Sequence, residues 1–160
     1  MTATPSPARK AVVRPFERRD VGAVLALMRA LAVFEGYDDE FRVTEADIVD
    51  HGLGPSPRFG VFVAEVDGVI VGIAVHYLIP WTYDLKPVVV LKELYVAEAA
   101  RGKSVGRALV ERLRDHATSI GASAIKWTVL HSNMPAKAFY RSLDGRADDT
   151  WELWKLTIDG

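Results

Sequence analysis

Two spacings of hydrophobic residues alternate along the chain. Apolar residues recurring every three to four positions predict amphipathic helices over residues 21–35, 105–120 and 134–143. Shorter apolar runs rich in β-branched residues predict strands over residues 11–14, 59–66, 69–79, 88–96, 123–130 and 151–157. Thr44 and Asp47 have the spacing of a capping box, which predicts a further short helix that ends near Gly52.

The order of these elements indicates the fold class. A strand, two helices, a three-strand meander, and then helix, strand, helix and strand indicate an α/β domain with a mixed sheet, not a doubly wound parallel one. Asp67-Gly68 separates two strand runs and predicts a hairpin turn. Asp20 and Asn133 are the expected caps of the first and last helices. Residues 11–160 are expected to form a single domain after a disordered leader at residues 1–10.

The composition is typical of one intracellular domain. Twenty basic and 21 acidic residues give a formal charge of -1, which favours neither nucleic acid nor an anionic membrane surface as a partner. The absence of cysteine excludes disulfides, thiolate metal sites and a cysteine nucleophile, and fits a reducing, cytoplasmic location. No apolar run is long enough to span a bilayer. The four histidines show no metal-ligand spacing, so we expect no metal site.

A basic, glycine-containing loop follows the predicted strand at residues 88–96. Its sequence leads directly into a helix and reads Arg101-Gly102-Lys103-Ser104-Val105-Gly106-Arg107. Glycine lets the backbone approach a ligand closely, a helix N-terminus favours negative charge, and the basic side chains add mobile positive charge. The loop therefore predicts a site for a phosphate-bearing ligand, with a solvated basic turn as the alternative. It has neither the Walker triplet nor the dinucleotide-binding glycine spacing.

The segment NMPAKAFY, from Asn133 to Tyr140, carries the second candidate chemistry. It follows a predicted strand and opens the last predicted helix. A phenol with a pKa near 10 can protonate a departing thiolate, whose conjugate thiol has a pKa of about 8.5. The alternative is that Phe139 and Tyr140 are core aromatics.

Taken in order, these features resemble the GNAT superfamily of N-acetyltransferases. The family signature is a buried strand, then Arg/Gln-x-x-Gly-x-Gly/Ala opening a helix, and later Asn-x-x-Ala-x-x-Phe-Tyr after the next strand. This chain has LKELYV, residues 101–106 and NMPAKAFY at fitting separations. Over residues 31–158, including the WTYD loop and WELWKL, the chain is similar to the diamine (spermidine/spermine) and thialysine N-acetyltransferase branch.

The resemblance implies a fold, an acetyl donor and roles for several residues. The implied fold has a mixed, mostly antiparallel sheet of about six to seven strands flanked by about four helices, and the implied donor is acetyl-CoA, without a metal. Glu93 would lie near the acceptor amine, and Tyr140 would be the general acid toward the CoA thiolate. The residues implied in cofactor binding are Leu94, Tyr95 and Val96 for pantetheine, Arg101, Gly102, Lys103, Ser104, Val105, Gly106 and Arg107 for the diphosphate, and Asn133 for the cofactor arm.

Three positions depart from the family pattern. Ser104 stands where the family usually has its central glycine, and Asp144 replaces a glycine after the last helix, so that Gly145 is expected to supply that turn. Lys92 stands where polyamine enzymes tend to carry an acid, and a lysine there would repel a polycation. Since neighbouring strand residues point to opposite faces, only one of Lys92 and Glu93 is expected to line the acceptor pocket.

The expected activity is direct acetyl transfer to a primary amine of a polyamine-like small molecule. Carboxylates and aromatic rings hold alkylammonium groups, and the expected acceptor contacts are Glu35, Trp81, Asp84 and Lys92. The alternative acceptors are an amino acid of the thialysine or lysine type, a xenobiotic amine and a protein amine. The alternative function is a CoA-binding sensor without turnover. The apolar segment at residues 151–157 suggests a homodimer that covers or exchanges this region, as the branch resemblance also implies.

Overall fold

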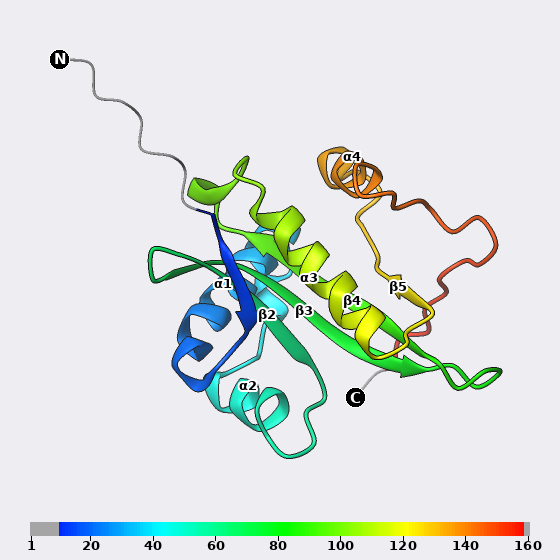
Figure 1. The fold of residues 1–160 in the computed structure, drawn as a ribbon, viewed down its shortest axis with the longest axis horizontal. Helices are drawn as coiled ribbons and strands as arrows, with labels where there is room; N and C mark the ends of the chain where they lie inside the picture. Colours follow the sequence, from blue (N-terminus) through cyan, green and yellow to red (C-terminus); the bar gives the residue numbers. More distant parts are fainter. Residues whose placement is uncertain (1–9, 159–160) are drawn as a thin grey trace. The chain divides into compact units, whose positions relative to one another are not determined.

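The computed structural model describes residues 10–158, so the expected leader lies outside the described residues except for Lys10. The chain divides into two compact units, residues 1–127 and residues 128–160, and each is described by itself. The first unit contains all the strands and three of the four α-helices of the described residues (Figure 1). The second unit contains the remaining helix.

One mixed sheet forms the centre of the first unit. Its strands lie in the order β1 (Val12–Pro15), β2 (Gly60–Val66), β3 (Val69–Pro80), β4 (Pro87–Val96) and β5 (Ala124–Lys126). Neighbours from β1 to β4 pair antiparallel, whereas β4 and β5 pair parallel. The predicted mixed, mostly antiparallel sheet is confirmed, with five strands among residues 10–158 in place of six to seven.

Two predicted strands need correction. The strand predicted over residues 123–130 is only three residues long, because β5 pairs with β4 at Val88–Val90 alone. The strand predicted over residues 151–157 is absent from the described part of the chain. No strand among residues 10–158 pairs with this segment, so it has no ladder to join. Its large apolar side chains are exposed, namely those of Trp151, Leu153, Trp154, Leu156 and Ile158.

The helices follow the predicted positions closely. The first unit contains α1 (Val21–Glu35), α2 (Glu45–Gly52) and α3 (Val105–Ser119), and the second contains α4 (Met134–Arg141). Thr44 and Asp47 form the predicted capping box of α2, and the side chain of Asn133 caps α4. Asp20 occupies the predicted N-cap position of α1, but its side chain makes no cap hydrogen bond to that helix. Asp67 and Gly68 form the predicted hairpin turn, both with positive φ.

The two faces of the sheet carry different helices. Ile73 and Val75 of β3 belong to a buried cluster with apolar residues of α1 and α2. Gly72, whose place in the strand directs it to the opposite face, lies against Val105 and Leu109 of α3. Helices α1 and α2 therefore cover one face of the sheet, and α3 covers the other.

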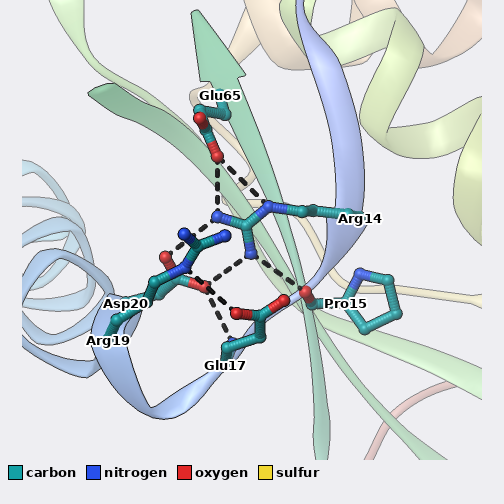
Figure 2. Close-up of polar contacts among 6 residues, drawn as sticks. All are labelled: Arg14, Pro15, Glu17, Arg19, Asp20 and Glu65. Carbon is teal, nitrogen blue, oxygen red and sulfur yellow. Dashed lines mark hydrogen bonds and ion pairs between the residues drawn. The ribbon is translucent and has the colours of Figure 1, made fainter. Parts of the chain in front are cut away.

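An ion-pair network joins the edge of the sheet to the start of α1 (Figure 2). The guanidinium of Arg14 donates to both carboxylate oxygens of Asp20, at 2.6 and 3.0 Å, and to Glu65 at 2.7 Å. Asp20 also accepts a hydrogen bond from the backbone N–H of Glu17 at 2.8 Å. These donors hold the pKa of the buried Asp20 carboxyl below its ordinary value, the bond from Arg14 most of all.

Candidate active site

The strands β4 and β5 separate after three residues, which leaves one backbone edge of β4 open. Their pairing ends at Val90 and Lys126. On its other side β4 stays paired with β3 as far as Val96. From Leu91 to Val96, this second edge of β4 therefore has no strand partner among residues 10–158.

The register determines which backbone groups reach the open edge. The N–H of Ala97 donates to the carbonyl of Val71 at 2.8 Å, toward β3. Because opposite residues of an antiparallel pair alternate between bonded and non-bonded positions, Tyr95 directs its backbone groups to β3. Leu94 and Val96 direct theirs to the open edge. Of the three residues expected to pair with pantetheine, these two have the required orientation.

The basic loop turns sharply into α3. Gly102 and Ser104 both have left-handed backbone conformations, with φ of 73° and 62°. Ser104 directly precedes the first residue of α3, Val105, so the loop presents the positive end of the helix. Gly106 lies within the first turn of α3 and has no positive φ.

The basic side chains of this loop have contacts within the first unit. Lys103 donates from Nζ to the carbonyl of Ala99 at 3.1 Å, and Arg107 lies 3.9 Å from Glu111. These are exposed contacts, which a phosphate can replace at little cost. The loop thus retains mobile positive charge beside its backbone donors.

Arg101 connects the loop to the open strand edge. Its Nε donates to the carbonyl of Val96 at 3.0 Å. Its guanidinium lies over the ring of Tyr95, 5.4 Å from the centroid, and 6.0 Å from the ring of Phe34 in α1. Arg101 therefore contacts both β4 and the end of the helix that carries Glu35.

A β-bulge at Lys92 places Glu93 on the face covered by α1. Val75 pairs with Glu93, whereas the next residue of β3, His76, pairs with Leu91, and Lys92 has no partner in the β3 register. Paired residues share a face, so Glu93 lies on the side of Val75 and α1. The simple alternation from which we expected Lys92 and Glu93 on opposite faces does not hold across a bulge. Lys92 is exposed, and Glu93 is partly buried.

Three acidic groups interact at this point. One carboxylate oxygen of Glu93 is buried with no hydrogen-bond partner among residues 10–158. Burial raises the pKa of Glu93, Lys92 opposes that rise, and Glu35 adds to it. Burial, Glu93 and Glu35 raise the pKa of Tyr37 as well. The structure thus brings Glu35, Glu93 and Tyr37 together, and Tyr37 is one of the aromatic residues that the sequence offers for the acceptor side.

The aromatic loop after β3 has a different environment. Trp81 packs edge-on against Tyr83, with ring centroids 5.7 Å apart, and the ammonium of Lys126 lies 5.3 Å from the Trp81 centroid. Asp84 accepts a hydrogen bond from the backbone N–H of Lys86 at 3.0 Å, within the turn. Sequence reasoning missed Lys126, because only the pairing of β5 with β4 brings it near this loop.

The second unit contains the remaining expected site residues. The Oδ1 of Asn133 accepts from the N–H of Ala136 at 3.1 Å, which leaves its NH₂ group to donate elsewhere. Tyr140 packs edge-on against Phe139, with centroids 5.3 Å apart. Asp144 itself adopts the left-handed conformation of the turn after α4, with φ of 65°. The prediction that Gly145 supplies this turn is therefore wrong.

Neither a metal cluster nor a membrane-spanning helix occurs in the described part of the chain. No group of three or more potential ligand side chains there could hold a metal ion. No helix there is both long and apolar enough to cross a bilayer.

Comparisons with known proteins agree with this architecture. The profile of the acetyltransferase (GNAT) family matches residues 24–144. Thialysine N-epsilon-acetyltransferase of Sus scrofa is 26% identical over 151 residues, covering 89% of this chain and 88% of that protein. Spermidine/spermine N(1)-acetyltransferase-like protein 1 of Homo sapiens is 28% identical over 156 residues, covering 90% of this chain and 22% of that protein.

A solved structure has the same fold. It is the aminoglycoside acetyltransferase meta-AAC0020 from an uncultured soil metagenomic sample, in complex with sisomicin. The TM-score is 0.79 at 18% identity, over 93% of this chain and 97% of that chain. With a family profile that spans most of its length, the chain belongs to the acetyltransferase (GNAT) family.

Proposed function

We propose that the protein transfers an acetyl group from acetyl-CoA directly to a primary amine of a small molecule. The observation that carries the proposal is the open edge of β4 beside the loop that begins α3. Leu94 and Val96 offer backbone groups on that edge, and Glu93 precedes Leu94 on the face covered by α1. This arrangement supports a donor site and an acceptor site that share one strand.

The donor side follows from backbone chemistry. Acetyl-CoA supplies the acetyl group as a thioester. Leu94 and Val96 hold the pantetheine arm by strand-like hydrogen bonds, and the N–H of Leu94 polarises the thioester carbonyl. The amides after Gly102 and the N-terminus of α3 hold the diphosphate, with Arg107 among the side chains that add charge. Ser104 has the left-handed backbone conformation that glycine adopts readily, so the loop keeps the shape expected of the glycine that the family usually has there. This supports the loop as the diphosphate site.

Glu93 is the proposed general base. An alkylammonium with a pKa near 10.4 must lose a proton before its nitrogen can attack the acetyl carbon. Glu93 accepts that proton, through water where the distance requires it, and its raised pKa suits it to the task. The new C–N bond forms as the C–S bond breaks. Tyr140, at its place in the NMPAKAFY motif, is the proposed donor of a proton to the thiolate.

The acceptor is proposed from charge. Glu35 and Glu93 attract an ammonium group, and Tyr37 adds a polarisable ring with a hydroxyl group. One relative is named for thialysine and another for spermidine and spermine, which supports either a diamino acid or a polyamine. Since the chain has no cysteine, the proposed route does not pass through a thiol ester of the protein.

We also propose a cytoplasmic homodimer. The apolar side chains of residues 151–158 are exposed in one chain, and Trp154 is 85% exposed. Covering them with a second copy would bury apolar surface and give the segment a strand to pair with. The lack of cysteine supports the reducing compartment. Size-exclusion chromatography with light scattering should give a dimer for the full chain and a monomer for a variant that ends at Thr150.

Steady-state release of CoA thiol tests the function. Purified protein is given acetyl-CoA with polyamines, amino acids, an aminoglycoside and peptides in separate reactions, and the products are identified by mass spectrometry. We expect thiol release with one class of small amine and an equal amount of its N-acetyl product. Binding of CoA without turnover of any amine would instead favour the non-catalytic sensor.

A further inference from the structure

We propose that Lys126 binds a carboxylate of the acceptor, so that the preferred substrate is an amino acid whose amine lies at the far end of its side chain. The proposal rests on the acetyl transfer proposed above and narrows its acceptor. Lys126 is the last residue of β5, and its role follows from where the sheet places it. Nothing in the spacing of the sequence singles it out.

Lys126 shares a face of the sheet with Glu93. Lys126 pairs with Val90 of β4, and Val90 pairs with Tyr77 of β3. Tyr77 lies two residues beyond Val75, the partner of Glu93, so both lie on the same face. The bulge at Lys92 produces this arrangement, because Val90 and Glu93 are three residues apart and would otherwise face opposite ways.

The separation of the two charges fits a short diamino acid. Val90 and Glu93 are about 7–10 Å apart along β4, at roughly 3.3 Å per residue with one residue bulged. Lys126 lies one strand to the side, a step of about 4.8 Å. Two flexible side chains based at the ends of this span leave room for an extended acceptor with roughly four to six carbons. Its ammonium would lie by Glu93 and its carboxylate by Lys126.

Trp81 holds the ammonium of Lys126 in place. The Nζ atom lies 5.3 Å from the centre of the Trp81 ring, a cation–π contact. Tyr83 packs edge-on against the same ring. The ring of Trp81 thus already has a cation from the protein, which gives it a positioning role for Lys126 in place of the expected contact with a substrate ammonium.

The signs of the charges decide between the candidate acceptors. A polyamine that placed one ammonium by Glu93 would bring its next ammonium toward Lys126. Like charges at that end disfavour it, whereas a carboxylate there is attracted. The site therefore selects a molecule with one positive and one negative end.

Matched substrate pairs test the inference. L-lysine and 1,5-diaminopentane differ only by a carboxylate, as do L-ornithine and 1,4-diaminobutane, and L-2,4-diaminobutyrate and 1,3-diaminopropane. We expect kcat/KM of the wild-type protein to be at least tenfold higher for the amino acid in the best pair, with acetylation at the side-chain amine. Lys126→Met, which keeps the apolar stem, should lower that preference at least fivefold, and Lys126→Glu should reverse it.

Two further variants separate position from charge. Trp81→Leu should raise KM for the amino acid severalfold with little change in kcat, and should leave the diamine unaffected. Lys10→Met, which removes an exposed lysine ahead of β1, is the matched control and should leave every ratio unchanged. Far-ultraviolet circular dichroism and melting curves show whether each variant is folded.

The possible failures are distinct. If the wild-type protein acetylates the diamine of each pair as well as the amino acid, or if Lys126→Met leaves the ratio unchanged, the inference about Lys126 is wrong while acetyl transfer stands. The inference about Lys126 would also be wrong if the protein acetylated other amines but none of the six compounds in these pairs. If the protein acetylates no amine at all, the proposed function itself is wrong.

Discussion

Arg101 donates a hydrogen bond from Nε to the backbone carbonyl of Val96 at 3.0 Å, on the strand edge where we propose that acetyl-CoA binds. A guanidinium held there places positive charge beside the path of the diphosphate. We expect Arg101→Leu to weaken binding of CoA about fivefold, equivalent to about 1 kcal/mol, in isothermal titration calorimetry at low salt. Arg101→Gln keeps a donor and should lose less. Unchanged affinity in Arg101→Leu would remove Arg101 from the cofactor site.

The pH dependence of the reaction should follow the charges around Glu93. Because burial raises the pKa of Glu93, the rise of kcat with pH should be centred above the ordinary pKa of a glutamate. Glu35→Gln removes a repelling charge, so it should move that rise to lower pH. Lys92→Met removes the cation that lowers the pKa, so it should move the rise to higher pH. If both variants keep the wild-type midpoint, Glu93 is not the group that titrates.

The left-handed Ser104 stores strain that glycine would relieve. The left-handed backbone conformation costs a residue with a β-carbon about 1 kcal/mol of conformational free energy, and replacement by glycine removes part of that cost. Ser104→Gly should therefore stabilise the protein by about 0.5–1 kcal/mol in urea denaturation and bind CoA at least as tightly as the wild type. Gly102→Ala, at φ of 73°, should have the opposite effect on stability. A loss of CoA binding in Ser104→Gly would make the hydroxyl a specific ligand.

The network of Arg14, Asp20 and Glu65 should stabilise the fold at neutral pH. Asp20→Asn leaves the partly buried Arg14 guanidinium with Glu65 as its one remaining carboxylate partner and should cost about 2 kcal/mol in urea denaturation. Arg19→Gln breaks an exposed pair and should cost less than about 1 kcal/mol. Equal losses of unfolding free energy in Asp20→Asn and Arg19→Gln would contradict a stabilising role for the buried Asp20 carboxylate.

The same network has a predictable pH dependence. The folded protein holds the pKa of Asp20 below its unfolded value, so the folded state binds fewer protons across that interval. The stability that Asp20 adds is complete above its unfolded pKa and is lost as the pH falls through the folded one. Asp20→Asn should flatten the acid side of the stability curve measured between about pH 2 and 6. An acid limb identical to that of the wild type would contradict this account.

Local sequence patterns predicted the elements well where the cause is local. The capping box at Thr44 and the turn at Asp67-Gly68 depend on residues within four positions of each other, and both occur as predicted. The segment at residues 151–157 has the composition of a strand, but a strand also needs a partner, and composition does not supply one.

The site was predictable as a set of motifs and less so as a geometry. The loop from Arg101 was visible in the sequence because glycine and basic residues precede a helix. The bulge at Lys92 was not visible, since it depends on the register of β4 against β3, and it alone determines which helix Glu93 faces. Lys126 was missed for the same reason, because sheet pairing brings it to the site. Tyr37 was one of several aromatic candidates on the acceptor side, and its interaction with Glu93 and Glu35 became visible only in the fold.

Residue-resolved amide hydrogen exchange, with and without saturating acetyl-CoA, tests the central claim most directly. If the cofactor arm binds along the open edge of β4, the amides of Leu94 and Val96 should exchange much more slowly in the complex. The amide of Tyr95, directed toward β3 in either state, should change little and serves as an internal reference. Unchanged exchange at Leu94 and Val96, with acetyl-CoA shown by calorimetry to be bound, would contradict the account.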